Sequence, residues 1–261
     1  MFKIFKGIRL ILNHIGIFPQ TIWINIIGLS WFIPDFFNLI RQKKESQVDP
    51  WKISLYPILT NKYESSGSVR TFYFLQDLYV SNLIFKNNPI RHIDIGSRID
   101  GFVAQVASYR EIEIYDIRPL EDKIWNIKFT QANLMENNEI DITDSISCLH
   151  TIEHFGLGRY NDPIDYEGYL KGLNTIYSML QTNGVFYFST PIGIERISFN
   201  AHRVFSIQRL LDIFKDQYTI LDFSYIDDNY NFHQSMELNP SNISTSFDCK
   251  TGCGIFVLQK I

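Results

Sequence analysis

The sequence RHIDIGSRIDGFVAQVASYREIEIYDIRP, residues 91–119, decides the fold of this chain. It predicts a strand that ends at Gly96, a helix, and a second strand that ends at Asp116. The spacing between the glycine turn and this acid is close to the ~20 residues expected for a carboxylate that reaches a ribose hydroxyl. The stretch is therefore typical of a site for a nucleotide-type cofactor. It lacks the full G-x-G-x-x-G pattern of a pyrophosphate-binding turn, which argues against NAD.

The rest of the chain repeats this alternation of strand and helix. The predicted strands cover residues 92–95, 111–116, 127–134, 144–149, 184–190, 218–225 and 254–259, and the predicted helices outside the opening stretch cover 69–85, 165–180 and 206–214. Such alternation predicts a mostly parallel α/β sheet with helices on both faces. Ligands of these sheets bind at the carboxyl ends of the strands, where the glycine turn, Asp116 and Asn133 fall.

The first 50 residues are predicted to form an apolar helical extension of a domain at residues 51–261. Residues 15–34 carry no charge and reach the ~20 residues that cross a bilayer. Basic residues flank this tract on both sides: Lys3, Lys6, Arg9, Arg41, Lys43 and Lys44. Pro19 and Pro34 interrupt it, which favours two short amphipathic helices. Packing on the protein is favoured over contact with a membrane interface and over a span. No cleavage site follows, so a signal peptide is not expected.

The composition is that of a globular protein, with 45% hydrophobic and 20% charged residues. The 261 residues are enough for one large α/β domain with an added segment. A net charge of -4 provides no broad basic field, so nucleic acid is not expected as a partner. Cys148, Cys249 and Cys253 fit no metal pattern and are expected to be buried free thiols in a reducing cytosol.

Seven sequence blocks together resemble the class I S-adenosylmethionine-dependent methyltransferases. They are YFLQDLYV (73–80), RHIDIGSRIDGFVA (91–104), YDIRPL (115–120), HTIEHFGLGRYNDPID (150–165), STPIG (189–193), AHRVFS (201–206) and GCGIFVL (252–258). The chain looks most like a mainly bacterial domain of unknown function of that type, often found near surface-polysaccharide genes. The resemblance covers roughly residues 55–261.

This resemblance implies a Rossmann-like fold with a seven-stranded sheet, an antiparallel last strand, and a site for S-adenosylmethionine. The expected cofactor-binding residues are Asp94, Gly96, Ser97, Arg98, Gly101, Asp116, Asn133, Leu134, His150 and Thr151. Asp116 is expected to hold the ribose hydroxyls. Arg118 is expected to pair either with Asp116 or with acidic residues of the loop. The family's loop is richer in glycine. Arg98 stands at its middle position, where it either donates to the methionine carboxylate or narrows the pocket.

Methyl transfer to a hydroxyl group needs a base that removes the hydroxyl proton. The first candidate is His154 and the second is His202, because both titrate near neutral pH. Glu153 is expected to orient one of them. The alternative for each histidine is a structural hydrogen bond to a loop backbone. With His150 these residues also admit a metal site, but H-x-x-E-H strings are common in metal-free methyltransferases, so no metal is expected.

The loop at residues 155–164 is long, polar and glycine-containing, and it is expected to form a wall of the acceptor site. The candidate substrate-binding residues are Arg159, Tyr160 and Asp162 of this loop and Asp165, which directly follows it. The alternative is a loop that only closes the fold.

The predicted function is S-adenosylmethionine-dependent methyl transfer, with a saccharide or surface-glycan precursor as acceptor. The site is expected in the cytoplasm, with residues 1–44 available for peripheral contact with the inner face of the membrane. The alternative is a degenerate methyltransferase fold that acts as a binding module in glycan assembly or at a membrane surface.

Overall fold

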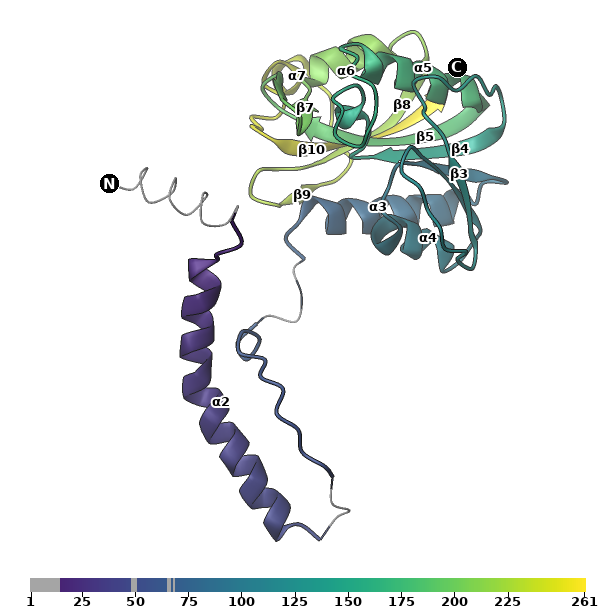
Figure 1. Ribbon diagram of the computed structural model, residues 1–261. Helices are drawn as coiled ribbons and strands as arrows, with labels where there is room; N and C mark the ends of the chain where they lie inside the picture. The colour runs from purple at the N-terminus through teal and green to yellow at the C-terminus, as the bar shows by residue number, and fades with distance from the viewer. Residues whose placement is uncertain (1–14, 48–50, 65–66, 68) are drawn as a thin grey trace. The chain divides into compact units, whose positions relative to one another are not determined.

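The computed structural model describes residues 15–47, 51–64, 67 and 69–261. They belong to two compact units, Met1–Ser68 and Val69–Ile261 (Figure 1). The division predicted from the sequence, at residue 50, assigns residues 51–68 to the larger domain, whereas their contacts group them with the N-terminal helix. The basic residues Lys3, Lys6 and Arg9 lie outside the described residues.

Among its described residues, the N-terminal unit contains one long helix, α2, Pro19–Glu45, in place of the two short helices expected from the sequence. Pro19 lies at its first turn, where its missing N–H costs nothing. Pro34 lies in the interior, where it removes one hydrogen bond without ending the helix. The large apolar side chains of α2 are mostly exposed within the described chain, and 64% of the surface of Trp23 is accessible to solvent.

The segment after α2 runs back along it. Gly28 is the one buried residue of the helix, and a Cβ atom there would lie 2.4 Å from the backbone oxygen of Leu59. Lys62 forms an ion pair of 2.6 Å with Asp35, and its ammonium lies 4.8 Å from the centroid of the Trp31 ring. These contacts explain why residues 51–62 group with the helix.

The larger unit is built on one mostly parallel sheet with the strand order β3-β2-β1-β4-β5-β10-β8-β9. Its strands are β1 (His92–Ile95), β2 (Ile112–Asp116), β3 (Ile127–Gln131), β4 (Thr143–Leu149), β5 (Leu180–Ile192), β8 (Tyr218–Ile226), β9 (Phe232–His233) and β10 (Gly252–Lys260). β10 lies between β5 and β8 and is antiparallel to both. This confirms the predicted fold with its antiparallel last strand, to which the two-residue strand β9 adds an edge.

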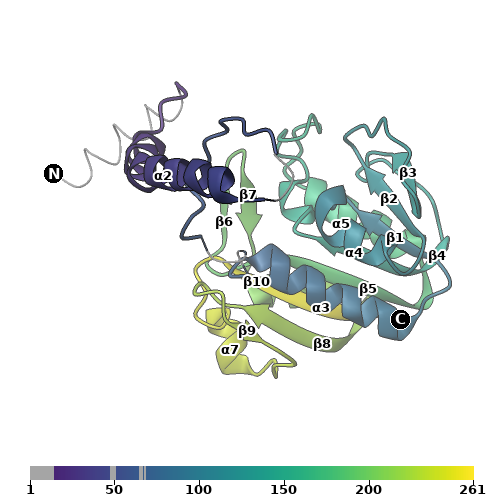
Figure 2. The same cartoon turned by 90° about the horizontal axis from the view of Figure 1, so that it is seen from below.

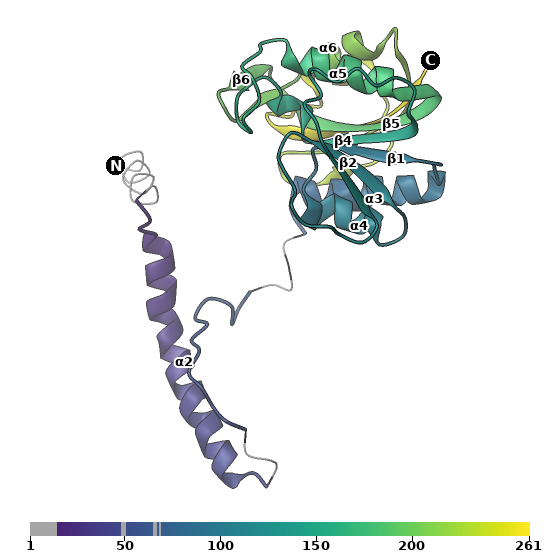
Figure 3. The same ribbon diagram turned by 45° about the vertical axis from the view of Figure 1, so that its right-hand side comes forward.

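Helices cover both faces of the sheet (Figure 3). They are α3 (Phe72–Asn87), η1 (Ile99–Val103), α4 (Ala104–Ala107), η2 (Ile152–His154), α5 (Gly168–Met179), α6 (Ile207–Phe214) and α7 (Pro240–Thr245). Figure 2 looks onto the face that α3 and α4 cover. The predicted N-cap of α6 is confirmed, because Ser206 accepts a hydrogen bond from the backbone of Arg209 at 3.1 Å.

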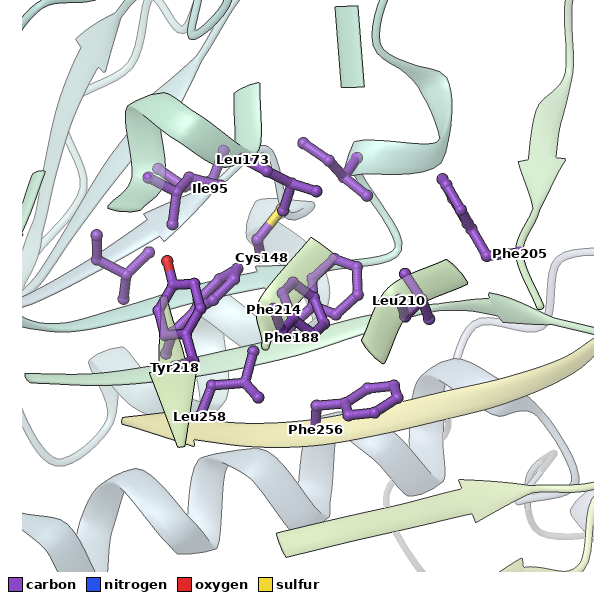
Figure 4. Packing of buried hydrophobic residues seen from close by; sticks show 14 of the residues in the cluster. Ile95, Cys148, Leu173, Phe188, Phe205, Leu210, Phe214, Tyr218, Phe256 and Leu258 are labelled. Atoms are coloured by element: carbon purple, nitrogen blue, oxygen red, sulfur yellow. The ribbon is translucent and has the colours of Figure 1, made fainter. Parts of the chain in front are cut away.

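The core on the α5 and α6 face is rich in aromatic rings (Figure 4). The Phe214 ring centroid lies 5.5 Å from that of Phe188 and 5.9 Å from that of Phe256. Full burial of such a side chain contributes about 1.5–3 kcal/mol. The three cysteines are buried free thiols, as predicted. A second buried apolar cluster, with Val80 and Ile84 of α3, packs on the other face. The two clusters together hold the carboxyl edge of the sheet, where the turns after β1, β2 and β4 meet.

A hairpin that the sequence did not predict lies beyond this edge. Its strands are β6 (Arg196–Ser198) and β7 (His202–Val204). Arg203, buried, donates hydrogen bonds from its guanidinium to the backbone oxygens of Phe155 and Tyr166, at 2.5 and 3.1 Å. The hairpin therefore holds both ends of the loop that follows β4.

Candidate functional site

A cavity of about 590 Å³ lies at the carboxyl edge of the sheet. This is within the range of ~300–1,000 Å³ typical of small-molecule sites. The predicted site residues that line it are Gly96, Ser97, Arg98, Gly101, Asp116, Asn133, Leu134, His150, Thr151, His154, Arg159, Tyr160 and Asp162. The structure thus brings together residues from the turns after β1, β2, β3 and β4.

The turn after β1 depends on Asp94, which is fully buried and does not line the cavity. Its carboxylate accepts hydrogen bonds from the Ser97 backbone N–H and the Ser97 hydroxyl, both at 3.0 Å, and from the Ser147 hydroxyl at 2.6 Å. Burial raises the pKa of Asp94 to about 7, against the effect of these donors. Asp94 therefore shapes the turn from beneath the cavity.

Gly96 takes a backbone conformation that a side chain would prevent. Its φ is +71°, and a Cβ atom would lie 2.4 Å from Cγ2 of Thr151. The turn therefore needs glycine both for its left-handed backbone and for its close approach to the end of β4.

Arg98 and Asp100 form an exposed ion pair on the next part of the turn. The guanidinium donates to both carboxylate oxygens, at 2.9 and 2.6 Å. Both residues line the cavity, and Gly101 beside them leaves helical geometry within η1. The mouth of the cavity thus carries a charged but internally neutralised pair.

One end of the cavity, called here the β2 end, consists of Asp116, Arg118, Asn133 and Leu134. Arg118 donates from Nε to both oxygens of Asp116 at 3.0 Å and from Nη2 to the Gly96 oxygen at 3.0 Å. The predicted pairing of Arg118 with Asp116 is thereby confirmed. The Arg118 guanidinium also lies 4.9 Å from the centroid of the Tyr160 ring.

The other end, called here the β4 end, consists of Gln76, Asp77, His150 and His154. His154 Nδ1 lies 2.6 Å from the Ala201 oxygen. A carbonyl oxygen only accepts, so Nδ1 carries the proton and Nε2 is left with its lone pair. Burial lowers the pKa of His154, although the Glu153 carboxylate opposes this. The ring is therefore neutral near pH 7, with Nε2 at 3.9 Å from Glu153 Oε1.

Glu153 and His150 form a buried pair beneath this end. His150 Nδ1 lies 2.9 Å from Glu153 Oε1. Burial lowers the pKa of His150, but Cys253 and the Glu153 carboxylate raise it more, so the net pKa is well above its usual value. Among the described residues, neither His150 Nε2 nor Glu153 Oε2 has a hydrogen-bond partner. Glu153 Oε1 therefore lies within 3.9 Å of both His150 and His154. The sequence predicted that Glu153 orients a histidine, with His154 as one candidate. Glu153 does not line the cavity.

Besides Asp94 and Glu153, two further predicted site residues lie outside the cavity lining. His202, on β7, is partly exposed. Asp165 pairs with Lys171 at 2.6 Å and accepts from the Glu167 backbone at 2.9 Å. Within the described part of the chain, no group of three or more His, Cys, Asp or Glu residues is placed to hold a metal ion.

The sequence from residue 104 to residue 261, more than half of the chain, matches the family described as "Caenorhabditis protein of unknown function, DUF268". The chain belongs to this family. A comparison with curated proteins finds no match.

Solved structures of methyltransferases and related enzymes resemble this DUF268 chain. The [4+2]-cyclase SpnF is 10% identical, with a TM-score of 0.50 over 75% of this chain and 85% of its own. The 1,6-didemethyltoxoflavin-N1-methyltransferase of Burkholderia thailandensis, with bound S-adenosylhomocysteine, is 13% identical, with a TM-score of 0.47 over 71% and 78%. The N-methyltransferase NodS of Bradyrhizobium japonicum WM9, with S-adenosylhomocysteine, is 10% identical, with a TM-score of 0.47 over 84% and 97%. At such low sequence identity the similarity concerns the fold alone. SpnF has a similar fold but is named for a cyclisation and not for methyl transfer.

Among the cavity residues of the DUF268 chain that were not predicted from the sequence, three lie on α3: Tyr73, Gln76 and Asp77. Gln76 and Asp77 are buried, although they are polar. The available signal was this adjacent polar pair within the apolar run YFLQDLYV. A polar pair on the buried side of a helix needs partners, and here the cavity lies beside it.

Proposed function

We propose that this protein transfers a methyl group from S-adenosylmethionine to a hydroxyl group of a saccharide or surface-glycan precursor. The observation that carries the proposal is the joint occurrence, in one cavity, of an acid at the end of β2 and a neutral histidine at the end of β4. Asp116 suits two vicinal hydroxyls of a ribose. His154 offers an unprotonated Nε2 to an acceptor.

The residues of the site fit the cofactor. The left-handed Gly96 leaves space where a Cβ atom would meet Thr151, Asn133 and Leu134 provide one polar and one apolar wall, and the cavity has the necessary size. When bound, S-adenosylmethionine supplies an electrophilic methyl group on a sulfonium sulfur. The chain contributes binding, orientation and removal of one proton.

The proton transfer is assigned to His154. With the cofactor bound, His154 Nε2 would accept the proton of the acceptor hydroxyl, whose oxygen would take the methyl group that the cofactor supplies. The bond from Nδ1 to the Ala201 oxygen fixes the tautomer, and Glu153 stabilises the imidazolium that results. Arg159, Tyr160 and Asp162 lie in the same wall and are assigned to the acceptor.

The test is turnover with methyl-labelled S-adenosylmethionine and a panel of nucleotide sugars and lipid-linked saccharides. Label in a saccharide, with release of S-adenosylhomocysteine only when that saccharide is present, supports the proposal. Labelling of none of them, together with cofactor binding, contradicts the saccharide acceptor.

A second function, a non-catalytic binding module, is favoured by one observation. Both oxygens of Asp116 are already engaged by Arg118, which leaves the acid fewer lone pairs for a ribose. Calorimetry separates the two functions. A folded protein that binds neither S-adenosylmethionine nor S-adenosylhomocysteine is a module and not a methyltransferase.

The proposal also places the protein in the cytoplasm, with α2 in contact with the inner face of a membrane. Support comes from the exposed apolar side chains of α2 and from the absence of charge between Arg9 and Asp35. α2 has the length and hydropathy of a membrane span, with a mean hydropathy of 1.3, and Lys43 and Lys44 follow in its last turn. Such basic residues suit an anionic lipid surface.

Flotation of the full chain with phosphatidylglycerol vesicles tests this membrane contact. The chain is expected to float with the vesicles, a Trp23→Asp variant to float less, and a Leu221→Asp variant, which changes an exposed residue of β8, to float like the wild type. Recovery of the wild-type chain away from the vesicles contradicts the contact.

A further inference from the structure

The carboxylate of Asp77 faces the cavity from α3 without a cationic partner. Its side chain is buried, and its Oδ1 accepts a hydrogen bond from Gln76 Nε2 at 3.0 Å. No ion pair to it is formed by any of the residues that the structure describes. A carboxylate offers about four acceptor sites, so Asp77 retains acceptor capacity toward the cavity.

The turn after β1 has a glycine, Gly101, at the point where the Asp77 carboxylate approaches it. A Cβ atom on Gly101 would lie 3.3 Å from Asp77 Oδ2. Gly101 therefore allows the carboxylate to lie against the turn. The cavity connects this position with the turn and with Asp116.

A buried carboxylate without a counter-charge is costly, and a cation in the cavity would remove that cost. Burial raises the pKa of Asp77 to about 6, although Gln76 and the charge of His150 oppose this. The basic side chains of the lining bind other groups. Arg98 pairs with Asp100, Arg118 with Asp116 and His150 with Glu153. Arg159 donates to the Ala201 oxygen at 2.9 Å.

We infer that Asp77 binds the α-ammonium group of the cofactor's amino-acid tail and so selects a zwitterionic nucleoside. The inference rests on the proposed function, because it concerns the same cavity. Asp116, the turn after β1 and Asp77 line one cavity, so a ligand held at Asp116 would be able to extend past the turn toward α3. The tail carries one cation. Among the described residues, two carboxylates of the lining, Asp77 and Asp162, form no ion pair. Both oxygens of Asp162 accept backbone N–H groups of its own loop, from Gly158 and Tyr160, whereas Asp77 lies against the turn after β1.

The experiment measures two ligands against three proteins by calorimetry. The ligands are S-adenosylhomocysteine and its deamino analogue, which keeps the carboxylate and lacks the ammonium. The proteins are the full chain, Asp77→Asn and Asp212→Asn, which changes an exposed residue of α6 outside the cavity lining. Asparagine preserves the shape of the side chain, and the thermal midpoint of each variant verifies that it is folded.

The wild type is expected to bind S-adenosylhomocysteine about tenfold or more tightly than the deamino analogue, as for a charge-assisted hydrogen bond. Asp77→Asn is expected to lose this preference and to keep its affinity for the analogue, while Asp212→Asn keeps both. Equal preference in the wild type and Asp77→Asn overturns the inference, as does an equal loss of both ligands. Failure of the wild type to bind either ligand overturns the proposed function itself.

Discussion

The two ends of the cavity differ in how their charged side chains are neutralised. At the β2 end, Asp116 is paired with Arg118 two residues away, so its charge is neutralised within one short segment. At the β4 end, residues from α3 meet residues that follow β4, which are more than seventy positions later in the sequence. The first end is neutralised by its own neighbour, whereas the second keeps a carboxylate and a neutral imidazole available. The β2 end therefore suits recognition of a constant ligand, and the β4 end suits the chemistry.

Removal of the base at the β4 end is expected to have the largest effect. His154→Ala should lower kcat by about 10²–10³-fold without weakening S-adenosylhomocysteine binding, because the ring acts on the acceptor proton. His202→Ala, outside the cavity, is the control and should keep kcat. Since burial lowers the pKa of His154, wild-type activity should fall only as the pH drops below about 6.5. An unchanged kcat for His154→Ala contradicts the assignment.

The turn that joins the two ends provides the second test. Gly96→Ala should destabilise the larger unit by about 2–4 kcal/mol, from left-handed strain and from the overlap with Thr151. The measurement is urea unfolding. Adding Thr151→Ser removes the overlapping methyl group and should restore part of the loss. No restoration would mean that strain in the backbone accounts for the whole effect.

At the β2 end, Asp116→Ala should weaken S-adenosylhomocysteine binding about 10- to 30-fold, which corresponds to about 1.4–2 kcal/mol. Glu113→Ala is the matched control: it removes another acid of β2, also paired with an arginine, that does not line the cavity. Calorimetry measures both. If Asp116→Ala binds like the wild type, Arg118 has withdrawn this acid from ligand binding and the ribose assignment fails.

The smallest effect concerns stability and pH. The pKa of Asp77 is raised to about 6 from 3.8, so the folded state binds the proton more tightly than the unfolded state. Its contribution to stability is complete below pH 3.8 and is lost as the pH rises through 6. Asp77→Asn should therefore exceed the wild type in unfolding free energy at pH 8 by on the order of 1 kcal/mol, and this gain should shrink toward pH 4. A gain independent of pH contradicts the titration of Asp77.

The same contrast explains how much the sequence could predict. The β2 end follows from residues 91–119 because its geometry is local: a strand, a glycine and an acid at a fixed spacing. The mostly parallel sheet with helices on both faces follows from the alternation of strand and helix, and its antiparallel last strand was implied by the family resemblance. Asp94 was expected to bind the cofactor, but it lies beneath the turn, since spacing alone cannot tell a carboxylate that faces a ligand from one that holds the backbone.

Tertiary contacts account for what the sequence could not predict. Gln76 and Asp77 have a role only because α3 packs beside the turn after β1, and nothing in their local spacing indicates that. The hairpin of β6 and β7 is too short to give an apolar pattern. The single helix α2 was missed because Pro34 was expected to end the helix, while the rest of the apolar run continues it.

The position of β10 sets an order for the assembly of the larger unit during synthesis. This strand is made last of all the strands and yet lies between β5 and β8. Until residues 252–260 have left the ribosome, β5 and β8 have no strand between them and Phe223 lacks its ring contact with Phe256, at 4.7 Å between centroids. The nascent chain thus carries two open strand edges, which are prone to pairing with other chains. A chain that stops before residue 252 should therefore depend on chaperones far more than one that contains β10.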